Sequence, residues 1–285
     1  MLLDRFETLL EFLATNPAQH PRGSAFYSFV DGVVKQAFLE AKPVFEAGKP
    51  VLLAEFGELT LPYEKMGAID SIDLFGLDEL LMFAFYYRNK GRYQRAADIG
   101  ANMGLHTVLL SRAGCEVEAF EPDPAHYDKL MRNLALNDVT NAKVYKAAVS
   151  EKVGQMQFVR VLGNTTSSHL AGAKASPYGD LERFDVDVLD IKDIVKRVDF
   201  LKIDAEGHEA VILKAIELED WDRIDAFVEI GSPENARDVF DKFDGSSINI
   251  FAQKLGWQSV RDFAHMPISY KEGGIFISTK AEMPW

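Results

Sequence analysis

A glycine-containing turn in the first half of the chain constrains the fold more than any other segment. Residues 98–104 read DIGANMG, directly after an apolar strand predicted over Ala96–Ile99 and before a helix predicted over Leu105–Ala113. Gly100 lets the backbone turn sharply and approach a ligand closely, and Gly104 allows close packing where the helix begins. A strand, a tight turn and a helix in this order are typical of a β-α-β unit in a mostly parallel sheet.

The same alternation of apolar strands and helices continues toward the C-terminus. Further strands are predicted over Glu116–Phe120, Lys143–Val149, Phe200–Ile203, Ala226–Ile230, Trp257–Phe263 and Gly274–Ser278. Further helices are predicted over Ala125–Asn137, Ala210–Ile216 and Glu234–Phe243. Repeated units of this kind predict a mostly parallel sheet with helices on both faces, and right-handed crossovers nearly determine the topology of its first half.

The region ahead of this alternation has a helical pattern. Helices are predicted over residues 2–13, Phe26–Leu39 and Leu77–Tyr87. Pro43 and the turn at residues 48–50 are expected to break the second helical pattern, and Val51–Pro62 is expected to form short strands.

A long polar segment also interrupts the alternation. Strands are predicted over Gln155–Val161 and Phe184–Leu189, and Gly163–Asp180 lies between them. A polar loop of this length inside a compact domain is usually functional or mobile. The segment is therefore interpreted either as a lid or substrate loop or as a plain surface excursion.

Composition narrows the classes of function. The chain has 285 residues, of which 47% are hydrophobic and 26% charged, as in an ordinary globular protein. This length suggests one large domain or two modest ones. The formal net charge of −13 argues against a general nucleic-acid or anionic-membrane binder, since phosphate contact relies on clustered positive charge.

Nothing in the sequence indicates secretion. Asp4, Arg5, Glu7 and Glu11 interrupt the apolar N-terminus, and the densest apolar run, Leu80–Tyr87, is too short to span a bilayer. The single cysteine, Cys115, cannot form an internal disulfide. We therefore expect a cytoplasmic protein without a membrane span. The sequence makes no prediction about its oligomeric state.

An acidic residue follows the second strand of the β-α-β pattern. Glu121 lies 23 residues after Asp98, at the carboxyl end of Glu116–Phe120. In doubly wound sheets ligands bind at this edge, and an acid there accepts hydrogen bonds from ribose hydroxyls. The pattern therefore favours a cofactor that contains a nucleoside.

The spacing of the turn separates two such cofactors. A dinucleotide fingerprint has a second glycine that makes room for pyrophosphate, and Asn102 occupies that place here. Asp98 also precedes the turn, where a carboxylate is unfavourable beside pyrophosphate and favourable beside an ammonium or sulfonium group. S-adenosylmethionine is therefore favoured over NAD.

Four motifs occur in a fixed order: DIGANMG at residues 98–104, FEP at 120–122, LMRN with LN within 130–137, and LKIDAEGHE at 201–209. Together they resemble the FkbM family of S-adenosylmethionine-dependent methyltransferases over roughly residues 75–280, and the last motif is the most specific. The resemblance implies a class I methyltransferase fold, an α/β, Rossmann-like, doubly wound seven-stranded sheet whose last strand runs antiparallel. It also implies O-methylation, often of sugar or polyketide hydroxyls.

The resemblance also assigns cofactor-binding residues. The turn would hold the methionine part of S-adenosylmethionine, and Glu121, followed by Pro122, would bind the ribose hydroxyls. Ala148 follows the third strand, where adenine usually lies. The residues that the turn would contribute are Asp98, Gly100, Ala101, Asn102 and Gly104.

Ionisable residues crowd the end of the strand predicted over Phe200–Ile203. Methyl transfer to a hydroxyl requires positioning of the two reacting atoms and removal of the hydroxyl proton. The catalytic candidates are Asp204, Glu206 and His208. Each has a structural alternative, since an aspartate before a helix is also a good helix cap.

Three weaker candidates for substrate contact remain. They are Glu79 at the start of a buried helix, His169 in the polar segment and Glu229 at the end of a strand. Asp204 and Glu229 are of a type that binds divalent cations, but the sequence has no dedicated ligand spacing, so no metal is expected. His106, near the start of the helix after Gly104, is a further pocket candidate.

The sequence thus predicts an O-methyltransferase that acts on a hydroxyl of a saccharide or other small metabolite. The alternatives are an NAD-type oxidoreductase and a non-catalytic module that binds a nucleoside cofactor. Residues 71–285 are expected to form the Rossmann-like domain, and residues 1–70 a helical extension or cap that helps select the acceptor.

Overall fold

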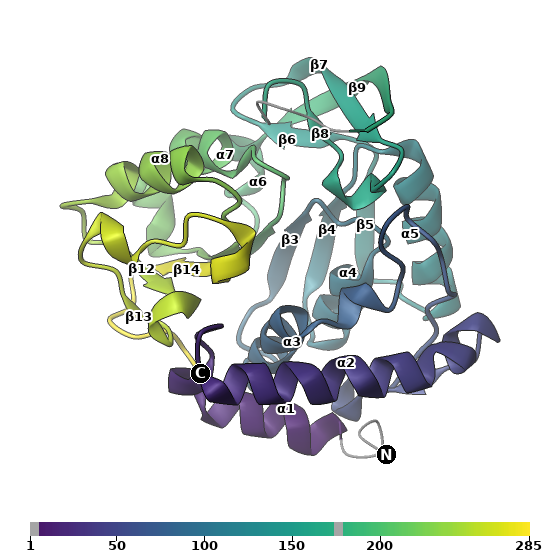
Figure 1. Ribbon diagram of the computed structural model, residues 1–285. Helices are drawn as coiled ribbons and strands as arrows, with labels where there is room; N and C mark the ends of the chain where they lie inside the picture. The colour runs from purple at the N-terminus through teal and green to yellow at the C-terminus, as the bar shows by residue number, and fades with distance from the viewer. Residues whose placement is uncertain (1–5, 174–178) are drawn as a thin grey trace.

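The computed structural model describes residues 6–173 and 179–285. Within them, eight strands form the main sheet in the order β13-β12-β14-β11-β10-β3-β4-β5 (Figure 1). Their bounds are β3 (Arg95–Ile99), β4 (Glu116–Phe120), β5 (Ala142–Tyr145), β10 (Phe200–Ile203), β11 (Asp225–Val228), β12 (Asn249–Ala252), β13 (Gln258–Ser259) and β14 (Ile275–Ser278). The central strands are short, apolar and buried on both faces, as in a parallel sheet that helices cover on both sides.

The directions of the strands give the topology. β5, β4, β3, β10 and β11 run parallel, whereas β14 is antiparallel to both of its neighbours, β11 and β12. The prediction of a doubly wound sheet with an antiparallel last strand is confirmed. The two-residue edge strand β13 adds an eighth strand to the expected seven. The strand predicted over Trp257–Phe263 stops at Ser259, and Asp262 caps the 3-10 helix η8 (Phe263–His265) instead.

Helices cover both faces of this sheet. One face carries α3 (Leu77–Arg88), α4 (Leu105–Arg112) and α5 (Pro124–Leu136). The other carries α6 (Ile191–Ile194), α7 (Glu209–Ala215) and α8 (Pro233–Phe243). Because side chains alternate along a strand, Phe200 joins the apolar cluster of the first face and Leu201 that of the second.

Two N-terminal helices pack on the side of the sheet that carries α3. They are α1 (Phe6–Thr15) and α2 (Ala25–Glu46), which run together along the lower edge of Figure 1. Ser24 caps α2 by accepting a hydrogen bond from the Tyr27 N–H. The break predicted at Pro43 is wrong, since α2 continues to Glu46. Proline removes one backbone donor, and near the end of a long, well-packed helix that loss is tolerated.

A second sheet lies across the top of the main sheet in Figure 1. Its order is β6-β9-β7-β8, with β6 (Ala148–Ser150), β7 (Gly154–Val161), β8 (His169–Leu170) and β9 (Leu181–Asp190). The single strand predicted over Lys143–Val149 is therefore wrong. Its first half pairs with β4 in the main sheet, whereas Ala148 onward pairs with β9. We call this four-stranded unit the small sheet.

The small sheet is joined to the N-terminal region by backbone hydrogen bonds. The Ala68 N–H donates to the Gly163 carbonyl oxygen at 2.7 Å, and the Thr165 N–H donates to the Met66 carbonyl oxygen at 3.0 Å. Gly67 has φ +91°, and a Cβ on it would lie 2.0 Å from the Gly163 carbonyl oxygen. A glycine is therefore required where the two segments meet.

The remaining elements are short. They are the hairpin β1 (Val51–Leu52) and β2 (Glu58–Leu59), and the 3-10 helices η2 (Pro17–Gln19), η3 (Ala54–Phe56), η4 (Asp73–Phe75), η5 (Thr165–Ser167), η6 (Leu218–Asp222), η7 (Gln253–Leu255) and η9 (Tyr270–Glu272). None of the helices in the described part of the chain has the length and apolar character that a membrane span requires.

Candidate active site

The DIGANMG turn is wedged between the ends of two strands. Gly100 adopts φ +74°, and a Cβ on it would lie 1.8 Å from the Asp204 carbonyl oxygen. The N–H groups of Gly100 and Ala101 both donate to the Phe120 carbonyl oxygen at 3.0 Å. Gly104, with φ +82°, begins α4, and a Cβ there would lie 3.0 Å from the Leu130 side chain. The turn therefore requires glycine at position 100 and leaves little room for a side chain at position 104.

Glu121 follows β4 directly and is held by two backbone donors. Its Oε2 accepts from the Asn102 N–H and its Oε1 from the Asp123 N–H, both at 2.8 Å. Burial raises the pKa of this carboxyl to about 8, although the two hydrogen bonds act in the opposite direction. Asn102 has φ +51°, and its buried Oδ1 has no hydrogen-bond partner among the described residues. The Glu121 side chain is thus fixed in orientation, and the nearby Asn102 Oδ1 is free to accept a hydrogen bond from a ligand.

Asp98 lies beneath the turn. It is fully buried, accepts a hydrogen bond from the Thr107 hydroxyl at 2.6 Å and lies 3.4 Å from the Lys202 ammonium. Lys202 also donates to the Gly100 carbonyl oxygen at 3.0 Å and lies 3.7 Å from Asp204. Burial lowers the pKa of Lys202, but Asp98, Asp204 and Glu79 together raise it above its usual value. The charge of Asp98 is therefore balanced by a lysine of this chain.

Lys202 has a role that the sequence interpretation did not assign. The residue was visible as the single charged position inside the apolar strand Phe200–Ile203. A lysine in such a strand is almost never fully buried unless it is paired. A lysine at this position in the sequence therefore indicates that carboxylates lie close to it in the fold.

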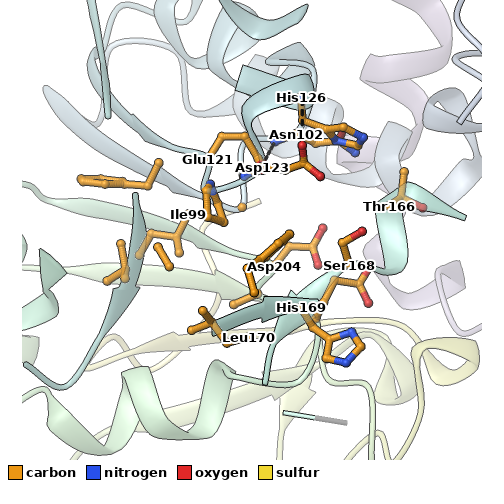
Figure 2. Close-up of a pocket in the computed structure, with 18 of the residues that line it drawn as sticks. Ile99, Asn102, Glu121, Asp123, His126, Thr166, Ser168, His169, Leu170 and Asp204 are labelled. Atoms are coloured by element: carbon orange, nitrogen blue, oxygen red, sulfur yellow. Dashed lines mark hydrogen bonds between the residues drawn. The ribbon is translucent and has the colours of Figure 1, made fainter. Parts of the chain in front are cut away.

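The turn and Glu121 form one wall of a cavity of about 620 Å³ that is partly open to solvent (Figure 2). We call it the first cavity. On this wall and beside it lie Ile99, Gly100, Asn102, Phe120, Glu121, Pro122, Asp123, His126, Asp204, Ala205 and Glu206. The small sheet and its loop supply the opposite wall: Ala148, Val149, Phe158, Thr165, Thr166, Ser168, His169 and Leu170.

An ion pair that the sequence did not indicate holds the small sheet at the rim of this cavity. Asp123 caps α5 and accepts two hydrogen bonds from the Arg160 guanidinium, at 2.7 and 2.6 Å. The Asp123 side chain is 2% exposed and that of Arg160 16%. Burial raises the pKa of Asp123, but Arg160 and neighbouring donors bring it below its usual value. His126 adds a second link, 2.9 Å from the Thr165 hydroxyl.

The predicted substrate residue His169 lies on the small-sheet side of the first cavity. It is buried, and its Nδ1 lies 2.9 Å from the Ser167 carbonyl oxygen. The structure therefore brings it together with the cofactor candidates, away from Glu79 and Glu229. The polar segment in which it lies contributes η5 and β8 to the cavity wall, while residues 174–178 of that segment lie outside the described residues.

The backbone of the DAEGHE segment after β10 is held in place by the side chain of its last residue, Glu209. Asp204, Ala205 and Glu206 line the first cavity, and Glu206 has φ +52°. The buried Glu209 carboxylate accepts hydrogen bonds from the N–H groups of Ala205 and Gly207, at 2.8 and 3.0 Å, and from the Asn235 amide. Glu209 therefore fixes the loop that presents Asp204 and Glu206.

His208, the third catalytic candidate, lines neither this cavity nor the one described below. It begins α7, and its Nε2 lies 2.8 Å from the Ser150 hydroxyl of β6. Burial lowers its pKa. The structure thus places His208 between α7 and the small sheet, where it links the two.

A second cavity, of about 1040 Å³, adjoins the first and shares Asp204 with it. Its lining combines the N-terminal region with the ends of β10 and β11. The lining residues include Arg22, Tyr27, Asp31, Lys35, Asp73, Asp78, Glu79, Met82, Lys202, Asp204, Phe227, Glu229, Gln253 and Tyr270. Asp78 pairs with Arg22 and accepts a hydrogen bond from the Gln253 amide at 2.7 Å. No motif in the sequence indicates this pair.

Carboxyl groups dominate the inner end of the second cavity. Glu229 follows β11 directly and lines the cavity, where its side chain is exposed. Partial loss of solvent inside the cavity raises its pKa well above the usual value, and the neighbouring Asp204, Glu206 and Glu79 raise it further. Glu229 therefore tends to retain its proton.

The two cavities suit different ligands. The first offers a fixed carboxyl, backbone groups and an apolar wall, which suits a nucleoside. The second is larger and lined mainly by polar and charged groups, and the two meet at Asp204. Within residues 6–173 and 179–285, no group of three or more histidine, cysteine, aspartate or glutamate side chains is arranged to hold a metal ion.

Solved structures similar to this chain agree only weakly with it. A SAM-dependent methyltransferase from Agrobacterium tumefaciens is 8% identical, with a TM-score of 0.40, covering 80% of this chain and 68% of that one. The N-terminal domain of EvdMO1, solved in the presence of SAH and D-fucose, is 15% identical with a TM-score of 0.30, covering 53% of this chain and 50% of that one. At these scores the likenesses carry no argument about the site.

Sequence comparisons are more specific. Methyltransferase sdnD from Sordaria araneosa is 29% identical over 174 residues, which cover 49% of this chain and 67% of that protein. Methyltransferase 1 from Beauveria bassiana (strain ARSEF 2860) is 26% identical over 153 residues, covering 46% of this chain and 61% of that protein. The family model described as the methyltransferase FkbM domain matches residues 98–264. The chain therefore belongs to the FkbM family of S-adenosylmethionine-dependent methyltransferases.

Proposed function

We propose that the protein transfers a methyl group from S-adenosylmethionine to a hydroxyl of a saccharide or other small metabolite. The observation that supports this most directly is the meeting of two cavities of different character at Asp204. A cofactor in the first cavity and an acceptor in the second would face each other there. Holding two reactants in line removes much of the barrier to a displacement reaction.

The first cavity fits the cofactor on the evidence of its unused groups. The buried Asn102 Oδ1, without a partner in the described part of the chain, is suited to accept from an amino group. Glu121 is proposed for the ribose hydroxyls, with the turn around the methionine part and Pro122 and Ala148 beside adenine. Bound S-adenosylmethionine supplies an electrophilic methyl group on a sulfonium centre.

The residues of the second cavity would then position the acceptor and receive its proton. Asp204 and Glu206 lie at or near the junction and are proposed to orient the reacting groups, with Glu79 and Glu229 on the acceptor side. Because His208 lines neither cavity, we propose a structural role for it and no longer a catalytic one. A base within hydrogen-bond reach of the acceptor typically accelerates proton transfer by about 10²–10⁴-fold.

We also propose that residues 1–70 act as a cap that selects the acceptor, attached to a Rossmann-like domain of residues 71–285. Arg22, Tyr27, Asp31 and Lys35 all line the second cavity, and none of them lines the first. Acceptor specificity would then depend on a region outside the motifs of the family.

Calorimetry with S-adenosylmethionine, followed by transfer of a radiolabelled methyl group to a panel of methyl glycosides and small alcohols, tests the proposal. We expect binding, and product with at least one polyhydroxyl acceptor. Failure of folded protein to bind at concentrations up to about 1 mM, the upper end of common KM values, would contradict it. Binding of NADH in its place would support an oxidoreductase, and binding without turnover on any acceptor would support a non-catalytic module.

A further inference from the structure

A chain of three hydrogen-bonding side chains leads from the core to the second cavity. Glu79 lies in the first turn of α3 and lines the cavity. His106 lies in the first turn of α4, with its Nε2 2.8 Å from the Glu79 Oε2 and its Nδ1 3.0 Å from the Tyr86 hydroxyl. Glu79 and Tyr86 are seven positions apart on α3, so they lie on the same face of that helix, toward α4.

The three hydrogen-bonded side chains differ in burial, from a buried tyrosine at one end to a partly exposed glutamate at the other. Tyr86 is 3% exposed and His106 8%, whereas the Glu79 side chain keeps 32% of its surface exposed and lines the cavity. The Phe83 ring packs against the His106 ring in an edge-on arrangement at 5.3 Å. The imidazole is thus fixed by packing and by two hydrogen bonds, and the open end of the chain is the Glu79 carboxylate.

The partners also determine where the imidazole proton lies. Burial raises the pKa of Tyr86 well above its usual value, with Asp98 and Glu79 adding to the effect, so the phenol keeps its proton. Because a carboxylate can only accept, the His106 nitrogen beside Glu79, Nε2, must carry a proton. In the neutral ring Nδ1 is then the acceptor, and the Tyr86 phenol donates to it. Which nitrogen of a neutral histidine carries the proton is set by its partner in this way.

We propose that Glu79 receives the proton of the acceptor hydroxyl and that His106, held by Tyr86, is a positioning residue that orients Glu79 toward the acceptor. The proposal rests on the function proposed above. In the balanced step the acceptor oxygen forms a bond to the methyl carbon and the carbon–sulfur bond breaks. Sulfur keeps the electron pair of that bond, the acceptor O–H bond breaks, and its proton passes to Glu79.

The other carboxyl groups at the inner end are less suited to this role. Asp204 lies 3.7 Å from the Lys202 ammonium, so its negative charge is partly balanced. Glu229 tends to be protonated. Glu79 differs from both because a buried histidine, His106, holds one of its carboxyl oxygens at 2.8 Å and so orients the side chain in the cavity.

Nuclear magnetic resonance of the side-chain nitrogens tests the arrangement without any acceptor. The full chain would be labelled with ¹⁵N-histidine, and the His106 signals assigned by their loss in His106→Phe. We expect a proton on Nε2 and none on Nδ1, and a change at Nε2 in Glu79→Gln. A proton on Nδ1 would overturn the proposal, because Tyr86 would then not donate to the ring.

Kinetics test the positioning role, using the acceptor found in the panel described above. His106→Phe keeps the ring shape and removes both hydrogen bonds, and we expect kcat to fall about tenfold to hundredfold, as for a small misplacement of a reacting group. The Kd for S-adenosylmethionine should stay unchanged. His106→Gln, whose amide can again donate to Glu79, should restore much of the loss.

The exposed His265 provides the matched control, since His265→Phe should leave kcat unchanged. Equal losses in His106→Phe and His106→Gln, or none in either, would overturn the positioning role. If the wild-type protein methylates no acceptor, the proposed function fails by itself. The position of the proton on His106 still decides whether the chain from Tyr86 to Glu79 exists.

Discussion

The two cavities are built in different ways. The first is formed around short sequence motifs, and backbone N–H groups orient its key carboxyl, Glu121. The second is assembled from residues far apart in the chain, and side-chain pairs such as Arg22 with Asp78 shape it. A cofactor site of the first kind can be recognised from sequence, because backbone geometry requires particular residues at fixed spacing. An acceptor site of the second kind depends on tertiary packing.

The largest effect is expected where the first cavity depends on glycine. In Gly100→Ala the new Cβ would overlap the Asp204 carbonyl oxygen, in a backbone conformation that disfavours side chains. We expect the free energy of unfolding to fall by about 4 kcal/mol or more, as for the most severe substitutions, and cofactor binding to be lost. Chemical denaturation and calorimetry measure both.

Gly154→Ala is the matched control, since a Cβ at Gly154 would meet no atom within 4 Å and its φ is not positive. It should leave stability and binding nearly unchanged. A Gly100→Ala protein with wild-type stability and affinity would show that backbone geometry does not determine the first cavity, and the contrast between the cavities would fail.

The second-largest effect is expected at Glu121. Glu121→Ala should lower the affinity for S-adenosylmethionine about tenfold to hundredfold, because it removes the hydrogen bonds to two ribose hydroxyls, each worth about 0.5–1.5 kcal/mol. The protein should remain folded, as circular dichroism would show. Unchanged affinity in calorimetry would remove Glu121 from the proposed ribose site.

Glu121 also makes stability depend on pH. Its pKa is raised to about 8 in the folded protein, so between pH 5 and 8 the folded state holds a proton that the unfolded state has released. Stability should therefore fall as pH rises through this range, by at most about 1.4 kcal/mol per pH unit. Glu121→Gln, which cannot titrate, should lose this part of the decline in denaturation measured at pH 5.5 and 7.5. Parallel curves for the two proteins would contradict the raised pKa.

Much of the fold could be predicted because its strands are short apolar runs bounded by polar or glycine residues. β4 and β10 were predicted with the bounds that the structure shows. β12 (Asn249–Ala252) was missed, since it begins at a polar residue and the 3-10 helix Gln253–Leu255 follows it without a break. The division between β5 and β6 was also missed, because it depends on pairing with β9, whose residues lie about forty positions further along the chain.

The site could be predicted only in part for the same reason. The motifs indicated Gly100, Asn102, Glu121 and Asp204, which line the first cavity. They did not indicate Arg160, which pairs with Asp123 across 37 positions, because the partner depends on how the small sheet is placed. His208 stands inside a specific motif, yet its side chain contacts β6, since spacing alone does not determine where a loop side chain points.

A third, smaller effect is expected at the ion pair that closes the first cavity. Arg160→Met keeps the length of the side chain and leaves the buried Asp123 without its partner, which should cost about 3 kcal/mol of stability. Affinity for S-adenosylmethionine should fall about tenfold, since the small sheet loses its tie to α5. Hydrogen exchange should be faster in β7 and β8. Wild-type exchange there would show that other contacts hold the small sheet in place.

The smallest effect is expected at the ion pair of the second cavity, Arg22 with Asp78. It can be compared directly with the ion pair of the first cavity, Arg160 with Asp123. The side chains of Arg22 and Asp78 are 31% and 29% exposed, and ion pairs open to solvent contribute about 1 kcal/mol or less. Arg22→Met should therefore change stability by less than about 1 kcal/mol and leave the Kd for S-adenosylmethionine unchanged. The acceptor KM should rise severalfold, because Arg22 lines only the second cavity. An effect on the Kd for the cofactor equal to that of Arg160→Met would mean that the two cavities form one binding unit.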